Sequence, residues 1–161
     1  MSGYRIREGR LPQDAPIGRA FIDGLQRFEK AMEDDRRVDD TVGAEFFDVL
    51  AGRVAEKQGR IFIAEDASGT AIGWAACFVE ENEIYVEADV RTFGYISELY
   101  VVDGARGKGI GRALIAKCEE HFRALKLKVM MIGVVAKNTN AQRSYLAAGF
   151  RPYSEMLQKA L

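Results

Sequence analysis

The apolar residues of this chain recur with two different periods. Spacings of three and four residues, typical of amphipathic helices, run through residues 21–32, 42–54 and 110–125. In the second of these segments the predicted apolar face is Val42, Phe46, Val49 or Leu50, and Val54. A fourth and shorter helix is predicted over residues 140–148, where Gly149 ends it.

Short apolar or alternating runs between these segments predict strands. They cover residues 4–8, 60–65, 71–79, 95–102 and 129–136, and a last strand begins at Phe150 and extends through Met156 and Leu157. The run at 129–136 is apolar on both faces, which is typical of a central strand. The predicted order is β-α-α-β-β-β-α-β-α-β, an α/β fold in one domain over residues 1–161.

A glycine-rich loop joins the predicted strand 95–102 to the helix that follows it. Its sequence is Arg106-Gly107-Lys108-Gly109-Ile110-Gly111, so three positions lack a side chain and a ligand can approach the backbone. The first N–H groups of a helix have no internal partner, and the helix dipole adds partial positive charge there. With Arg106, Lys108 and Arg112 nearby, the loop predicts an anion site, and phosphate is the usual anion.

Two common phosphate motifs do not fit this loop. The nucleotide P-loop needs a glycine where Val102 stands and a serine or threonine where Gly109 stands. The dinucleotide fingerprint needs a third glycine where Arg112 stands, and it normally lies in the first strand–helix unit of its domain.

A third pattern, Arg-x-x-Gly-x-Gly at Arg106, Gly109 and Gly111, does fit and resembles the acyl-CoA loop of the GNAT-type N-acetyltransferases. Residues 138–150 are similar to a second signature of that family, Asn-x-x-Ala-x-x-x-Tyr-x-x-x-Gly-Phe. The resemblance implies a GNAT-like mixed central sheet whose fourth and fifth strands splay apart, so that acetyl-CoA enters the gap. Backbone groups left unpaired by such a splay suit the amides of a pantetheine arm.

The resemblance also assigns residues to the cofactor. It implies that the pyrophosphate is bound by the loop and the first turn of the helix, namely Arg106, Gly107, Lys108, Gly109, Ile110, Gly111 and Arg112. It implies that the pantetheine is held by the backbone of Leu99, Tyr100 and Val101, with Asn138 and Ala141 also contacting the cofactor.

Two residues are predicted to carry protons. Tyr145 matches the family's general acid, and a phenol has an ordinary pKa near 10, close to that of a thiol. The alternative is that Tyr145 packs on the last strand. Glu98 is the carboxylate of the strand beside the cofactor and is the predicted base. Strict alternation would place it on the face opposite Ser97, and a bulge would change that, so a water chain at Ser97 remains an alternative.

The acceptor pocket is expected from the first two helices and from the segment before the strand 95–102. These carry Phe28, Glu29 and an acidic stretch over residues 80–89. An acidic lining would favour a cationic amine, whereas the simpler interpretation is that these carboxylates solvate a long loop.

Composition excludes several other classes of function. The net charge is −1, whereas a nucleic-acid-binding domain is typically basic. The apolar run 129–136 is too short to span a membrane. Cys77 and Cys118 have no metal-ligand spacing and are expected to be small buried hydrophobes, as in a reducing cytoplasm. The only histidine, His121, flanks an apolar helix face, so a packing role is expected and no metal site is predicted.

Together these features predict a cytoplasmic, acetyl-CoA-dependent N-acetyltransferase. The resemblance implies direct attack of a primary amine in a ternary complex, with a small molecule as the expected acceptor. A protein N-terminus or lysine side chain is the alternative acceptor, and a non-catalytic acyl-CoA-binding module is the alternative function. A homodimer is compatible with the resemblance.

Overall fold

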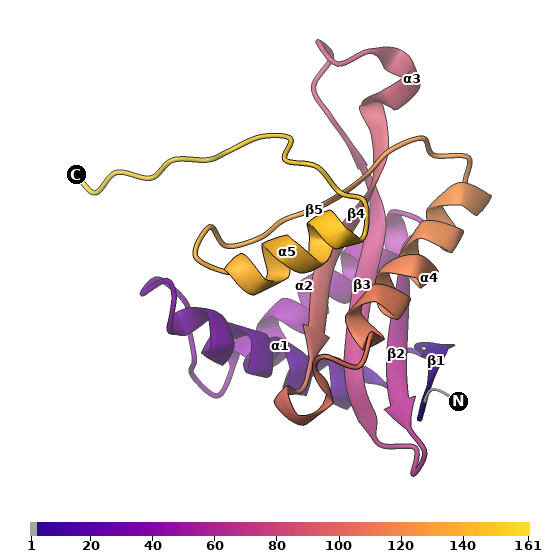
Figure 1. The fold of residues 1–161 in the computed structure, drawn as a ribbon, viewed down its shortest axis with the longest axis vertical. Coiled ribbons are helices and arrows are strands. Elements are labelled where there is room, and N and C mark those ends of the chain that lie inside the picture. The colour runs from indigo at the N-terminus through magenta and orange to yellow at the C-terminus, as the bar shows by residue number, and fades with distance from the viewer. Residues whose placement is uncertain (1–2) are drawn as a thin grey trace.

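A computed structural model describes residues 3–161 and contains one five-stranded sheet in the order β1-β2-β3-β4-β5 (Figure 1). The strands are β1 (Tyr4–Glu8), β2 (Arg60–Asp66), β3 (Ala71–Glu81), β4 (Thr92–Val101) and β5 (Met130–Ile132). The helices are α1 (Ala15–Lys30), α2 (Val42–Glu56), α3 (Ala88–Arg91), α4 (Ile110–Ala124) and α5 (Thr139–Ala147), and a 3₁₀ turn, η1, covers Asp103–Ala105.

The sheet is covered on both faces. Helices α1 and α2 pack on one face and α4 and α5 on the other (Figure 1). Strand β3 supplies both cores, because Trp74 and Phe78 face α1 and α2 while Cys77 faces α4. The period of two in a strand therefore fills two separate clusters, and the mixed α/β architecture predicted from the sequence is confirmed.

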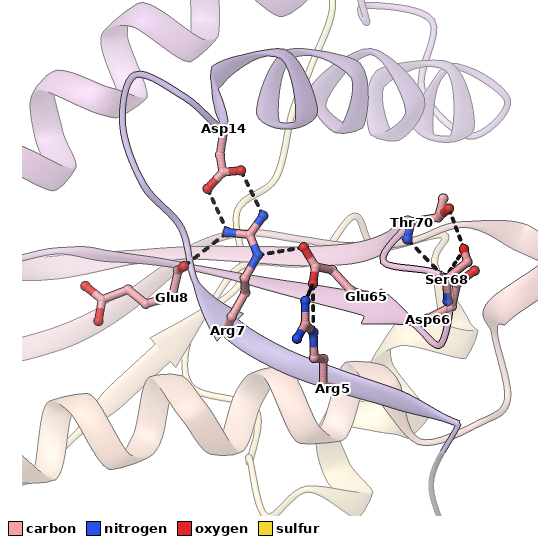
Figure 2. Close-up of polar contacts among 8 residues, drawn as sticks. All are labelled: Arg5, Arg7, Glu8, Asp14, Glu65, Asp66, Ser68 and Thr70. Atoms are coloured by element: carbon pink, nitrogen blue, oxygen red, sulfur yellow. Dashed lines mark hydrogen bonds and ion pairs between the residues drawn. The ribbon is translucent and has the colours of Figure 1, made fainter.

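An ion network fixes α1 against the sheet (Figure 2). Arg7 of β1 places its terminal nitrogens 2.7 and 2.8 Å from the two carboxylate oxygens of Asp14, the residue before α1. The Nε of Arg7 donates to Glu65 of β2 at 2.6 Å, and Arg5 donates to the other oxygen of Glu65 at 2.9 Å. Because Glu65 is buried, these partners compensate its desolvation, and they set the position from which α1 leaves the sheet.

Strands β4 and β5 separate soon after they meet. Their parallel pairing joins Gly94, Tyr95 and Ile96 to residues 130–132, and β4 continues to Val101 beyond that point. The predicted splay is therefore confirmed. It leaves the last residues of β4 paired with β3 on one side, and no strand of the described sheet pairs with their other side.

Two of the expected strands differ in the structure. Strand β5 covers three residues and lies at the edge of the described sheet, although residues 129–136 were expected to form a central strand. No strand follows α5 in the described chain, and Met156 is 98% exposed. Pro152 cannot donate a hydrogen bond to a ladder, and the side chains beyond it meet no apolar surface, so nothing favours pairing there.

The apolar face of α2 also differs from the prediction. The residues that α2 buries are Gly43, Phe47 and Leu50, whereas Val49 is 51% exposed. Gly43 permits a close approach to α1, because an added Cβ there would lie 2.5 Å from the Asp23 carboxylate. The expected residues Phe46 and Val54 do pack against this core, at its margin, and Leu50 lies inside it, so the prediction is wrong for Val49 and missed Phe47.

The two cysteines and the histidine lie where the sequence predicts them. Cys77 and Cys118 are free thiols buried in the cluster beneath α4. His121 is partly buried beside Phe122, and its Nε2 lies 2.7 Å from the carbonyl oxygen of Gln58. Within residues 3–161, no group of three or more His, Cys, Asp or Glu side chains could hold a metal ion. None of the helices described here is long and apolar enough to cross a membrane.

Candidate active site

The glycine loop has a backbone that requires glycine. Gly107 and Gly109 have φ angles of +75° and +80°, the left-handed region that side chains disfavour. Gly109 is the residue that caps α4, and it has no side chain to accept from the first-turn N–H groups. Ile110, buried in the core, anchors the start of the helix. The first N–H groups of α4 therefore have no acceptor within the helix and are available to a ligand at its N-terminus.

The space beside two of these glycines is open. An added Cβ at Gly111 would meet no heavy atom within 4 Å, and one at Gly109 would meet only the Tyr4 hydroxyl oxygen, at 3.9 Å. Gly111 lies inside α4 and has no positive φ, so neither the backbone nor packing within the protein requires glycine there. A phosphate-bearing ligand against the backbone would require it, and the residues present fit such a ligand.

The side chain of Arg106 lies against α1. Its guanidinium carbon is 4.5 Å from the ring centroid of Phe28 and 5.6 Å from that of Tyr100. Its Nε donates to the Val101 carbonyl oxygen at 2.9 Å, and Asp103 lies 2.9 Å from a terminal nitrogen. Arg106 and Phe28, predicted for the cofactor and the acceptor respectively, are thus brought together, while Lys108 and Arg112 are exposed at the loop.

A β-bulge in β4 decides which side chains face α1. Ala76 of β3 pairs with Glu98, but the next residue, Cys77, pairs with Ile96, so Ser97 is an extra residue. After the bulge the alternation is shifted, and Tyr95, Ser97 and Glu98 all line one pocket beneath α1 and α2. Leu99 and Val101 pack instead against the α4 cluster. Strict alternation, which separates Ser97 from Glu98, is therefore wrong for this strand.

Glu98 is a buried carboxylate. It is 7% exposed, and its Oε2 has no hydrogen-bond partner within residues 3–161. Burial, and to a smaller extent the charge of Glu29, raises the pKa of Glu98 to about 8. The neighbouring carboxylate, Glu29, forms an ion pair with Arg36, whose Nε donates to it at 2.7 Å. A carboxyl group with a pKa near 8 can exchange a proton at physiological pH.

Tyr145 lies in α5 and packs against the α4 cluster beside Phe150. Burial, followed by the charges of Glu29 and Glu98, raises the pKa of Tyr145 to about 12, so its phenol keeps its proton near neutral pH. Asn138 caps α5, since its side-chain oxygen accepts from the Ala141 N–H at 3.1 Å. The second sequence motif therefore positions Tyr145 and, in addition, starts the helix that carries it.

The pocket has a volume of about 780 Å³ and is lined by residues from 22–49, 95–98 and 133–135. Its apolar lining includes Ile22, Leu25, Val42, Phe46, Val49 and Val134. Glu29 lies in this lining, as predicted. The acidic stretch 80–89 contributes nothing to it in the described structure, and there Glu80 pairs with Lys57 at 2.6 Å and Asp89 with Lys128 at 2.9 Å.

A comparison with protein families identifies the chain. Residues 25–150 match the Acetyltransferase (GNAT) family, which covers most of the sequence and both of its motifs. The chain belongs to this family.

A second protein is related in sequence over part of its length. An uncharacterized N-acetyltransferase from Archaeoglobus fulgidus is 33% identical over 96 residues, which are 60% of this chain and 62% of the relative. The match therefore spans less than two thirds of that relative.

Solved structures share the fold over nearly the whole chain. A tetramutant of a Bacillus halodurans protein has a TM-score of 0.82 at 21% identity, over 98% of this chain and 99% of the other. An aminoglycoside N-acetyltransferase, AAC(6')-Iy, solved with CoA, has a TM-score of 0.75 at 18% identity, over 100% of this chain and 96% of the other. These neighbours confirm the GNAT fold predicted from the two motifs.

Sequence reasoning missed two features of this GNAT pocket. Arg36 lies in a charged segment that looked like a simple connection, yet it pairs with Glu29. Val42, Phe46 and Val49 were assigned to the core, yet all three line the pocket, and Phe46 alone of them also packs against the core.

Proposed function

We propose that this protein transfers an acetyl group from acetyl-CoA to the primary amine of a small molecule, by direct attack in a ternary complex. The observation that carries the proposal is the position of Glu98. It is a buried carboxylate without a partner in the described chain, on a bulge that faces the pocket. The same strand leads within a few residues to the glycine loop, so one element serves both substrates.

The proposed cofactor site uses residues that this chain provides. The N–H groups at the start of α4 bind the pyrophosphate, with Lys108 and Arg112 supplying charge. The edge of β4 over Leu99, Tyr100 and Val101 that β5 leaves uncovered holds the pantetheine arm, and Asn138 contacts the same arm. Acetyl-CoA supplies an acetyl group as a thioester. Structural neighbours in this family were solved with CoA and with acetyl-CoA, which supports the assignment.

In the proposed reaction Glu98 acts as the base. Its ionised carboxylate takes one proton from the acceptor ammonium, and the nitrogen lone pair then forms a bond to the acetyl carbonyl carbon. Tyr145 acts as the acid and gives its phenol proton to the sulfur as the carbon–sulfur bond breaks. The second proton of the nitrogen restores the phenol, so the protons balance and one proton is released by way of Glu98.

The first experiment is calorimetric titration of the protein with acetyl-CoA, with ATP and NAD as control ligands. We expect saturable one-site binding of acetyl-CoA alone. Gly111→Val should weaken this binding by about tenfold or more, because its side chain fills the space in front of the backbone. Gly52→Val is the matched control, since Gly52 is also a helical glycine whose added Cβ meets nothing within 4 Å.

The second experiment measures CoA release from acetyl-CoA in the presence of a panel of amines. Amine-dependent release supports the transferase. Binding of acetyl-CoA without release by any amine would replace it with a non-catalytic acyl-CoA-binding module. Absence of binding would mean that the glycine loop serves another ligand, and the proposal would fail.

A further inference from the structure

We infer that the acceptor carries a second ammonium group besides the amine that reacts, and that Glu29 and Asp35 bind this second group. The inference rests on the proposed function and specifies its acceptor as a diamine or a larger polyamine. It is drawn from one pocket that is lined both by Glu98, a buried carboxylate with an unpartnered oxygen, and by two further carboxylates that share a single guanidinium.

Glu98 provides the position of the reacting nitrogen. Its side chain is 7% exposed and lines the pocket, and its Oε2 has no hydrogen-bond partner within residues 3–161. A buried oxygen without a donor is costly, and an ammonium is a donor that can satisfy it. The proposed reaction also removes a proton from the acceptor nitrogen at this carboxylate. One ammonium is therefore held at Glu98, and any further charge on the acceptor meets the rest of the lining.

Two more carboxylates in the lining share one arginine. The Nε of Arg36 donates to Glu29 Oε2 at 2.7 Å, and its Nη1 donates to Asp35 Oδ1 at 2.5 Å. Neither bond uses Glu29 Oε1 or Asp35 Oδ2, and these two oxygens have no partner elsewhere in the described chain. The cluster thus has two negative charges and one positive charge, and one oxygen of each carboxylate is available to a ligand.

An ammonium group completes this cluster. It carries three N–H donors on one positive charge, so it can donate to both available oxygens, and the four groups then have no net charge. Arg36 keeps its place, because the ligand uses oxygens that the guanidinium does not contact. The Glu29 side chain is only 18% exposed, so its attraction for the ammonium is screened less than that of a surface carboxylate.

The second arginine of the lining offers no such position. Arg37 is also shared by two carboxylates, Asp39 and Glu45, each at 2.8 Å. Here Arg37 and the Thr41 hydroxyl together contact all four carboxylate oxygens. These carboxylates still add negative potential, because four carboxylates surround the two arginines. The excess favours a cation over an anion at the far end of the acceptor.

The test compares amines that differ only at the far end. Diamines with chains of four, six and eight carbons are compared with the monoamines of equal length, and 6-aminohexanoate supplies an anionic end. Binding to the CoA-loaded protein is measured by calorimetry, and kcat/KM by CoA release. We expect the best diamine to exceed its monoamine by about tenfold in both measurements, and 6-aminohexanoate to bind more weakly than hexylamine. The advantage of the diamine should shrink as salt is added, because Asp35 is 57% exposed.

Asp35→Asn tests the assignment of the second position. It removes one of the two negative charges at Arg36, so the ratio of diamine affinity to monoamine affinity should fall about fivefold. Asp34→Asn is the matched control. Asp34 is an exposed aspartate one residue away and lies outside the lining, so the ratio should stay as in the wild-type protein. Calorimetric binding of acetyl-CoA to each variant verifies that it is folded.

The outcomes separate this inference from the proposed function. Equal affinity for diamine and monoamine at all three lengths, or a preference for 6-aminohexanoate, would overturn the inference while leaving the transferase intact. A ratio that is unchanged in Asp35→Asn, or that falls equally in Asp34→Asn, would also overturn it. Failure of acetyl-CoA to bind, or of every amine to release CoA, counts against the proposed function, and calorimetry of the amines still decides the inference.

Discussion

Glu98 of β4 and Glu29 of α1 line the same pocket, and the charge of Glu29 adds to burial in raising the pKa of Glu98 to about 8. The two carboxylates differ in their surroundings, because Arg36 pairs with Glu29 whereas Glu98 is buried with an unpaired oxygen. Environments that separate two carboxylates in this way are typical of acid–base sites. Glu98 thus changes its charge near physiological pH.

Glu98→Gln should remove the acidic limb of the pH–rate profile. In the wild-type protein kcat should rise with pH through about 8 as Glu98 ionises. In the variant the limb disappears and kcat falls by about 10²-fold, the usual contribution of a general base. The measurement is kcat between pH 6 and 10 with acetyl-CoA saturating.

Ser97→Ala is the control for this profile. If a water chain at Ser97 served as the base, the acidic limb would persist in Glu98→Gln and would shift or vanish in Ser97→Ala. That pair of results would contradict the role assigned to Glu98.

Glu98 should also make stability depend on pH. Its pKa is higher in the folded than in the unfolded protein, so the folded state binds more protons between about pH 4.5 and 8. The stability that this group contributes is therefore present below that window and is lost as pH rises through it. The Tm of the wild type should fall relative to that of Glu98→Gln as pH increases from 5 to 9. A constant difference in Tm would show that Glu98 ionises normally in the folded protein.

Glu29→Gln should move the acidic limb to lower pH. Removing this negative charge makes ionisation of Glu98 easier, and it also frees the positive charge of Arg36. The measurement is again the pH dependence of kcat. Asp35→Asn is the control. It removes the other carboxylate that pairs with Arg36 and keeps the Arg36–Glu29 ion pair. A limb that moved to higher pH, or that did not move, would show that the two carboxylates are not coupled.

Tyr145→Phe should lower kcat by about 10²-fold while the affinity for acetyl-CoA is unchanged. Burial and the two nearby carboxylates raise the pKa of Tyr145 to about 12, so the phenol is protonated when a sulfur needs its proton. Tyr153→Phe, at an exposed tyrosine in the C-terminal segment, should leave both quantities unchanged. Normal turnover in Tyr145→Phe with intact acetyl-CoA binding would reduce this residue to a packing role.

Local sequence signals predicted the backbone of the glycine loop and the positions of α1, α4 and α5 well. Gly107 and Gly109 adopt the left-handed backbone that glycine permits, and α4 begins at Ile110, directly after the cap. Asn138 and Tyr145 fall on one short helix because the motif spacing sets them seven residues apart. Each of these features depends only on residues that are close in sequence, so the local sequence pattern is enough to predict it.

The face of Glu98 could not be predicted in this way. It depends on Ser97 being an extra residue against β3, and that register is set by pairing with a distant segment. The same limitation explains the C-terminal segment, where an apolar pattern predicted a strand but no edge receives it in the described structure. It also explains α2, where Val42 and Val49 were assigned to the core because a pocket-lining side chain and a core side chain look alike in sequence.

The most direct test of the central claim is the rate of CoA release from acetyl-CoA with and without 1,6-diaminohexane, followed across pH 6 to 10 in the wild-type protein. The account predicts release that requires both the protein and the amine, and that increases through about pH 8 as Glu98 ionises. Release that does not depend on any amine, or no release at any pH despite acetyl-CoA binding, would contradict it.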